Sequence, residues 1–126
     1  MTDMQILVVE DNERNMRLFR DVLEAAGHRT LAATTGEYAV ELAGEHAPDL
    51  VLMDIQLPGI GGVEALGRIR ADERTRAVPV LALTAQAMEG DRERFLAAGF
   101  DGYLSKPVDI ADLVATVGRY GRSTTR

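Results

Sequence analysis

The residues of this sequence best suited to handle phosphate or a hard metal ion each follow a short apolar segment. They are Glu10 and Asp11 after residues 6–9, Asp54 after 50–53, Thr84 after 80–83, and Lys106 after 103–105. If these segments are strands of an open parallel sheet, their C-terminal ends share one edge, where ligand sites form. Three carboxylates, one hydroxyl and one ammonium are then expected to meet in a single crevice.

The three carboxylates are candidates for a metal site. Glu10 and Asp11 leave the first predicted strand and Asp54 leaves the third, which are neighbours in the doubly wound order 2-1-3-4-5. Without a cation the three groups would repel one another and one or more pKa values would rise. All the side-chain donors are oxygens, which suits Mg²⁺ or Mn²⁺ and does not suit zinc.

The hydroxyl and the ammonium complete a site for a phosphoryl group. Thr84 can donate to one phosphoryl oxygen and Lys106 can neutralise another. Asp54 is then the candidate nucleophile, because an aspartate that attacks phosphorus gives an acyl phosphate. Taken singly, each residue has a plainer explanation as a helix start, a helix cap or a turn. Their joint occurrence at successive strand ends favours the functional interpretation.

The segments that must position these residues alternate between strand and helix patterns. Strands are predicted at residues 6–9, 29–33, 50–53, 80–83 and 100–104, and helices at 13–26, 36–46, 63–70, 86–98 and 110–117. Such alternation is typical of a parallel sheet with helices on both faces. The predicted fold is therefore α/β and flavodoxin-like, with five parallel strands in the order 2-1-3-4-5. Gly90 and its polar neighbours predict a weakly held start to the fourth helix.

Composition restricts the possible functions. The 126 residues suffice for one domain, predicted at residues 1–121, with a disordered polar tail at 122–126. A net charge of −6 argues against nucleic-acid binding. No apolar run reaches the ~20 residues of a membrane span, and no signal peptide is evident, so we expect a cytoplasmic protein without membrane contacts. Cysteine is absent. We expect His28 and His46 to be surface residues without a chemical role.

Four motifs of this sequence resemble the receiver domain of two-component response regulators, over roughly residues 4–121. They are Val8-Val9-Glu10-Asp11-Asn12, Leu52-Met53-Asp54-Ile55-Gln56-Leu57-Pro58, Leu83-Thr84-Ala85 and Tyr103-Leu104-Ser105-Lys106-Pro107. The sequence is most similar to single-domain receivers, although receivers attached to hybrid histidine kinases share its Glu-Asp-Asn opening. A single-domain regulator is expected because the tail lacks a Pro- or Gln-rich linker.

The resemblance implies a role for each motif residue. Asp54 would accept phosphate from a histidine kinase or a histidine phosphotransfer protein, and Thr84 and Lys106 would hold phosphoryl oxygens. Asp11, Asp54 and the backbone carbonyl of Gln56 would bind Mg²⁺, with Glu10 acting mainly through water. Tyr103 would be the aromatic switch that turns inward with Thr84. The surface of the fourth helix, fifth strand and fifth helix would then change and meet a downstream protein partner.

One position departs from the family pattern, and several alternatives remain. Many receivers carry Asp before the glycine that starts the third helix, whereas this sequence has Gly61-Gly62, which predicts a more mobile loop. A phosphatase of the haloacid-dehalogenase type would need Asp-x-Asp after its first strand. A flavodoxin-type electron carrier would need a phosphate-cradling loop there. The remaining alternative is a receiver-like interaction module that acts without phosphorylation. In the main interpretation the protein is a phosphoacceptor signalling protein rather than an enzyme.

Overall fold

The computed structural model describes residues 4–85 and 90–124, with side chains described up to residue 120. Strands and helices alternate along the chain in this order: β1 (Gln5–Val9), α1 (Glu13–Ala25), β2 (Arg29–Ala33), α2 (Gly36–His46), β3 (Leu50–Asp54), α3 (Gly61–Ala71), β4 (Val80–Thr84), α4 (Asp91–Ala98), β5 (Gly102–Ser105) and α5 (Ile110–Thr124). All strand pairs are parallel and the sheet order is β2-β1-β3-β4-β5, which confirms the predicted fold class. None of the described helices combines the length and the hydropathy that a bilayer crossing requires.

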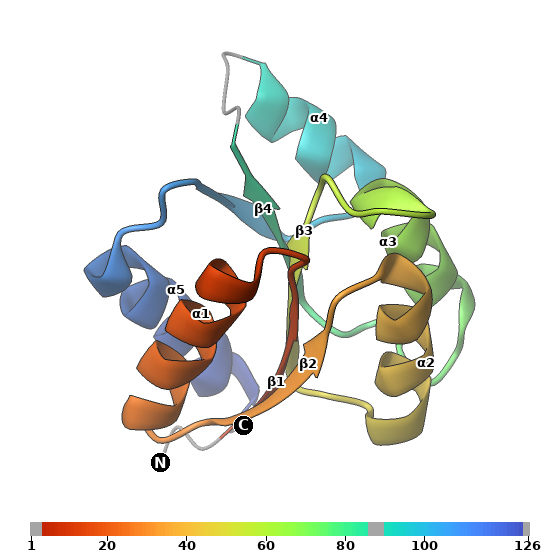
Figure 1. Cartoon of the computed structure of the whole chain (residues 1–126). Coiled ribbons are helices and arrows are strands. Elements are labelled where there is room, and N and C mark those ends of the chain that lie inside the picture. Colours follow the sequence, from red (N-terminus) through yellow and green to blue (C-terminus); the bar gives the residue numbers. More distant parts are fainter. Residues whose placement is uncertain (1–3, 86–89, 125–126) are drawn as a thin grey trace.

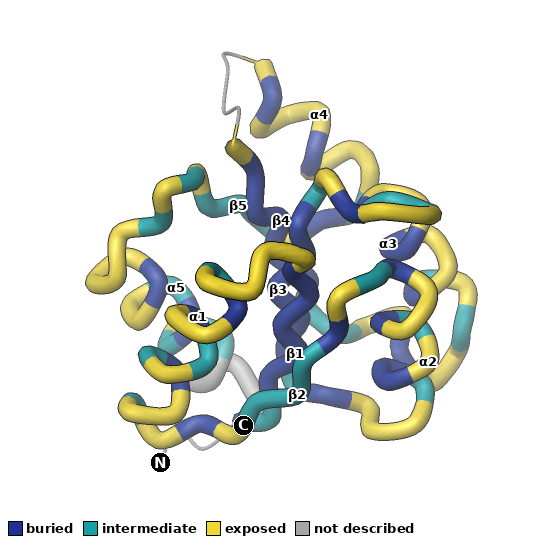
Figure 2. The backbone as a smooth tube through the Cα atoms, viewed as in Figure 1, coloured by how far each residue is buried: buried dark blue, intermediate teal, exposed yellow. Residues whose placement is uncertain are grey.

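The sheet is buried between two layers of helices. Helices α1 and α5 cover one face, and α2, α3 and α4 cover the other (Figure 1). Alternate residues of each inner strand point to opposite layers: Leu7 and Val9 pack toward α2 and α3, whereas Ile6 and Val8 pack toward α1 and α5. Both faces are therefore apolar, as continuous apolar strands predict. Strands β3 and β4 are buried along their whole length, whereas the helices are exposed on their outer sides (Figure 2).

Local capping fixes where several helices begin and end. The side chains of Asn12, Thr35 and Asp109 accept hydrogen bonds from backbone N–H groups three residues later, which satisfies donors that the first helical turn leaves free. After α4, Gly99 adopts a left-handed conformation with φ of 112°. By contrast, the start of α4 at Gly90 has no side-chain cap. The predicted start of this helix, at Gln86, lies outside the described residues.

Four apolar residues of α3, α4 and α5 are exposed: Val63, Leu96, Ile110 and Val114. In each helix the buried stripe is narrower than the apolar pattern, so residues at its margin reach solvent. The last helix is longer than predicted, since α5 continues to Thr124, past the predicted domain end at 121. The lone glycine at 121 is not followed by a proline that would stop the helix. Residues 125 and 126 lie outside the described part.

His28 contradicts the prediction of a surface residue. It is buried, and its Nδ1 accepts a hydrogen bond of 3.2 Å from the backbone N–H of Met4. The backbone N–H of His28 donates to Leu23 O at the end of α1. His28 thus links the end of α1 to the start of β1, at the point where the chain turns from α1 into β2. His46 is exposed, as predicted.

Candidate functional site

The C-terminal ends of β1 and β3 bring three carboxylates together. β1 and β3 are neighbours with Val9 opposite Met53, so Glu10 and Asp11 leave β1 beside Asp54, the last residue of β3. One carboxylate oxygen from each of Glu10, Asp11 and Asp54 lies within 4.8 Å of the others. Glu10 and Asp54 are buried, whereas Asp11 is exposed and opens the cluster to solvent.

Lys106 supplies the positive charge that this cluster requires. Its Nζ lies 2.8 Å from Glu10 Oε1 and 3.0 Å from Asp54 Oδ2. Burial acts to lower the pKa of Lys106, but its contacts with Glu10 and Asp54 outweigh burial and raise that pKa. Burial raises the pKa of Glu10, and the charge of Asp54 adds to the rise, although the contact with Lys106 opposes it. A single ammonium therefore offsets three neighbouring carboxylates only in part.

Backbone N–H groups orient two of the carboxylates. Gln56 N donates to Asp54 Oδ1 at 3.0 Å, and Asn12 N donates to Glu10 Oε2 at 3.2 Å. Each donor lies two residues after the carboxylate, in the turn that follows the strand. These turns hold the second oxygen of each carboxylate, so the oxygens that face Lys106 have fixed positions.

Gly62 has a structural role at the site that the sequence interpretation missed. A Cβ atom at Gly62 would lie 2.4 Å from the carbonyl oxygen of Asp54 and 2.9 Å from Ile55 Cα. The first turn of α3 therefore packs directly on the end of β3, and Gly62 N donates to Ile55 O at 3.0 Å. The second glycine of Gly61-Gly62, just where a helix begins, was the signal for this close approach. Gly61 has a φ of +72°, which glycine adopts without strain.

The ends of β4 and β5 place the remaining two predicted residues. Thr84 is buried at the last position of β4, and its carbonyl oxygen accepts a hydrogen bond of 2.7 Å from Lys106 N. Tyr103 is half-buried on β5, and its ring centroid lies 5.8 Å from that of Phe95 in α4. Thr84 and Lys106 are thus joined through the backbone, whereas Tyr103 lies on the α4 side of β5.

The donor set fits a small, hard divalent cation. Three carboxylates with one offsetting ammonium leave excess negative charge. Mg²⁺ prefers oxygen donors and keeps several waters, which the exposed Asp11 allows. No cysteine is present in the sequence, and neither histidine belongs to this cluster, so zinc-type ligands are lacking. The buried Glu10 Oε1, whose close contact is with the ammonium, adds to the demand for positive charge.

A family model and curated relatives point to the same protein family. Residues 6–118 match the family described as response regulator receiver domain. The polar-differentiation response regulator DivK of Brucella ovis is 47% identical over 115 residues, covering 91% of this chain and 94% of that protein. DivK of Brucella anthropi is 46% identical over 115 residues, with the same two coverages.

Solved structures agree with this relationship. The receiver domain of the sensor histidine kinase PA1611 of Pseudomonas aeruginosa PAO1, with a magnesium ion coordinated in its active site cleft, has a TM-score of 0.88 and 40% identity, covering 95% of this chain and 98% of that one. A LuxR-family two-component response regulator of Aurantimonas sp. has a TM-score of 0.86 and 30% identity, covering 96% of this chain and 86% of that one. With these likenesses and the strand-end motifs of its own sheet, the chain belongs to the response regulator receiver domain family, and its curated relatives are of the DivK type.

Proposed function

We propose that this receiver takes up a phosphoryl group on Asp54 from a histidine kinase or a histidine phosphotransfer protein. The observation that carries the proposal is the constellation around Asp54: a buried carboxylate, paired with Lys106 at 3.0 Å, beside Glu10 and Asp11. The alternative function is an interaction module with the same fold that is never phosphorylated.

The transfer follows from the chemistry of the side chain. A carboxylate oxygen of Asp54 attacks the phosphorus of a phosphohistidine, the P–N bond breaks, and its electron pair returns to the imidazole nitrogen. The product is an acyl phosphate on Asp54. Lys106 Nζ already lies at the carboxylate and offsets part of the added negative charge, while the Thr84 hydroxyl is the proposed donor to a phosphoryl oxygen. The protein contributes positioning and charge, and the high-energy bond comes from the donor.

Asp11, Asp54 and the carbonyl oxygen of Gln56 are the proposed protein ligands of Mg²⁺, with Glu10 acting through water. When bound, Mg²⁺ would offset charge on the carboxylates and on the incoming phosphoryl group. The magnesium ion in the PA1611 receiver domain supports this assignment. Mn²⁺ prefers the same kind of ligands and is an expected substitute.

The proposed output is a change in α4, β5 and α5. Tyr103 packs against Phe95 of α4 on one side of β5, while Thr84 ends the neighbouring strand β4. A shift of Thr84 toward a phosphoryl group would leave space that the Tyr103 ring can enter. Added charge at Asp54 would therefore bias the position of α4, whose start has no side-chain cap. A downstream protein would read this surface.

The test is the intact mass of the chain after incubation with a small-molecule phosphodonor such as acetyl phosphate, with and without Mg²⁺. We expect one phosphoryl adduct on the wild type that requires Mg²⁺, and none on Asp54→Asn. That substitution keeps nearly the same shape, so circular dichroism should show an unchanged fold.

Asp49→Asn is a matched control, because Asp49 accepts a hydrogen bond from Gln5 N outside the site. An adduct that persists in Asp54→Asn would overturn the assignment of the acceptor. If neither the phosphodonor nor a histidine kinase labels the wild type, the unphosphorylated interaction module is the better account.

A further inference from the structure

Asn12 takes part in hydrogen bonds that lead in opposite directions from one residue. Its backbone N–H donates to Glu10 Oε2 at 3.2 Å, inside the carboxylate site. Its side-chain Oδ1 accepts from Asn15 N at 2.9 Å, which caps the first turn of α1. Its carbonyl oxygen accepts from Met16 N at 2.9 Å in the same turn. The site and the start of α1 therefore share one residue.

Asp11 lies between two residues whose backbones are fixed. Glu10 N donates to Ala33 O of β2 at 3.0 Å, so the residue before Asp11 is tied to the sheet. Asn12, the residue after it, is tied to Glu10 and to α1. The Asp11 side chain is exposed, and within the described part of the chain no hydrogen bond or ion pair holds its carboxylate. The direction of this carboxylate therefore depends on the backbone of its two neighbours.

The side-chain cap restrains the backbone of Asn12. Its φ of −84° and ψ of 118° are extended rather than helical, as an N-cap residue requires. Without the cap acceptor, the N–H of Asn15 would lose its partner and the first turn of α1 could fray. Fraying would release the Asn12 N–H from Glu10 and loosen the backbone on one side of Asp11. The cap thus acts on the site through the backbone.

The cap of α2 is a natural comparison. Thr35 Oγ1 accepts from Tyr38 N at 3.1 Å, the same arrangement as at the start of α1. Thr35 follows β2, an edge strand that contributes no residue to the cluster of Glu10, Asp11 and Asp54. The two caps therefore share their local geometry and differ in their connection to the carboxylates.

We propose that Asn12 is a positioning residue that couples Mg²⁺ binding at the carboxylate site to the first turn of α1. Its side-chain cap holds the backbone that directs Asp11 and Glu10. Because such coupling is reciprocal, the first turn of α1 should become more ordered when Mg²⁺ binds. This proposal rests on the proposed function, since Asp11 and Glu10 are the residues assigned there to Mg²⁺.

The first experiment uses the unaltered chain. Backbone amides of the ¹⁵N-labelled protein are followed by NMR during a titration with MgCl₂ at constant ionic strength. The exchange of each amide hydrogen with water is measured before the titration and at saturation. We expect Mg²⁺ to slow exchange at Asn15 and Met16 more than at Tyr38, which occupies the first turn of α2. Equal slowing at the two helix starts, or none at Asn15 and Met16, would overturn the coupling.

The second experiment compares the Mg²⁺ dissociation constants of cap variants. Asn12→Ala removes the cap acceptor and should weaken binding about threefold to fivefold, up to the worth of one helix cap. Asn12→Ser keeps a side-chain acceptor and should restore the wild-type affinity. Thr35→Ala loses an equivalent cap and should lower the melting temperature as Asn12→Ala does, without a change in affinity.

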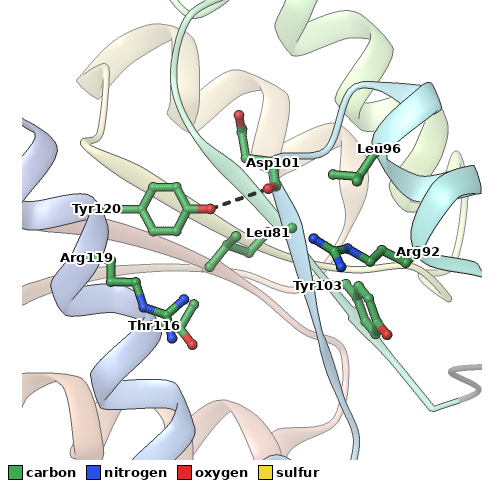
Figure 3. Close-up of a pocket in the computed structure, with 9 residues that line it drawn as sticks. Leu81, Arg92, Leu96, Asp101, Tyr103, Thr116, Arg119 and Tyr120 are labelled. Atoms are coloured by element: carbon green, nitrogen blue, oxygen red, sulfur yellow. Dashed lines mark hydrogen bonds between the residues drawn. The ribbon is translucent and has the colours of Figure 1, made fainter.

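Tyr120→Phe is a second control, because it removes a single hydrogen bond at the opposite edge of the sheet. Tyr120 O–H donates to Asp101 O at 3.4 Å, just before β5 begins (Figure 3). This variant should bind Mg²⁺ as the wild type does. The proposal would be overturned by unchanged affinity in Asn12→Ala, by equal weakening in either control, or by a failure of Asn12→Ser to restore binding.

The phosphoryl adduct is measured on the same samples. If the wild type forms the adduct while Asn12→Ala binds Mg²⁺ normally, the coupling is overturned and the proposed function stands. If Asn12→Ala alone loses Mg²⁺ affinity but neither acetyl phosphate nor a histidine kinase labels the wild type, the coupling stands and the phosphoacceptor role falls. A wild type that binds no Mg²⁺ would overturn the coupling together with the proposed Mg²⁺ site.

Discussion

At the scale of single residues, the site holds more negative than positive charge, and backbone N–H groups keep its carboxylates in position. Glu10, Asp11 and Asp54 face one ammonium, Lys106, and the turns after β1 and β3 fix the carboxylates through Asn12 N and Gln56 N. Such crowding destabilises the folded chain until a cation or a proton offsets it. The proposed function uses this excess charge to attract Mg²⁺.

The pH dependence of stability should reveal the imbalance at Glu10. Because burial raises its pKa above 4.5, the folded state binds this proton more tightly than the unfolded state does. The contribution of Glu10 to stability is therefore present at low pH and lost as pH rises through its folded pKa. In EDTA, the melting temperature of Glu10→Gln minus that of the wild type should increase from pH ~4.5 to ~7. Glu64→Gln, in an exposed pair with Arg68, is the control, and its difference should stay nearly flat. A flat profile for Glu10→Gln would contradict the expectation.

At the scale of elements, the contacts of α3 with its neighbours hold the segments around the site in position. The first turn of α3 packs on the end of β3 at Gly62. At its other end, Arg70 donates to the carbonyl oxygens of Gly99, Arg76 and Val78 and to Asp101 Oδ2. One helix therefore supports both the loop beside Asp54 and the corner where α4 turns into β5.

Gly62→Ala should destabilise the fold by about 1–3 kcal/mol, because the added Cβ would overlap backbone atoms of Asp54 and Ile55 that cannot move cheaply. Gly67→Ala is the matched control in the same helix, since a Cβ there meets nothing within 4 Å. That variant should gain about 0.5–1 kcal/mol from improved helix propensity. Urea unfolding of both variants gives the comparison. Equal stability for the two would contradict the close packing at Gly62.

Arg70→Gln should lower the free energy of unfolding by about 2–3 kcal/mol, because several carbonyl oxygens lose a charged donor at once. Arg70→Lys should not restore stability, since an ammonium cannot span acceptors on three segments as a guanidinium does. Arg68→Gln, two residues away, removes only an exposed pair with Glu64 and should cost less than about 0.5 kcal/mol. Hydrogen exchange should show the loss of protection near Gly99 in Arg70→Gln and not in Arg68→Gln.

The sequence was sufficient for the sheet order and for the elements that carry the site, because strand and helix periodicity and the strand-end residues are local signals. It was insufficient where side chains meet across the fold. His28 was predicted at the surface, because its partner Met4 lies far from it in the sequence. The contacts of Arg70 with Gly99 and Asp101, which are equally distant, had no signal in the sequence. Leu96 is 42% exposed, which shows that apolar character alone does not distinguish a core residue from one at the surface.

At the scale of the whole molecule, the candidate site lies at the edge of the sheet where the carboxyl ends of the strands meet. The carboxyl ends of the strands gather the charged residues, and the two apolar layers hold those ends in register. Binding of a cation at this edge should therefore stabilise the entire domain, since a ligand that binds only the folded state shifts the unfolding equilibrium.

Mg²⁺ at 100 times its dissociation constant should add about 2.7 kcal/mol to the stability of the wild type. For a chain of 126 residues the melting temperature should rise by about 4 °C per kcal/mol, which is about 10 °C in all. Asp11→Asn should lose most of this gain, because Asp11 is the exposed carboxylate of the cluster. NaCl at equal ionic strength is the control. A rise of equal size with NaCl, or in Asp11→Asn, would contradict a specific site.

The buried His28 and the exposed His46 give the molecule two spectroscopic reporters of its own. The sequence holds two histidines, one enclosed between the end of α1 and the start of β1, and one exposed at the end of α2. In a proton NMR spectrum the imidazole signals of the buried His28 should move when the chain unfolds, while those of the exposed His46 should move little. Since neither ring belongs to the carboxylate cluster, a variant that loses phosphorylation can be separated from one that has unfolded in a single unlabelled sample.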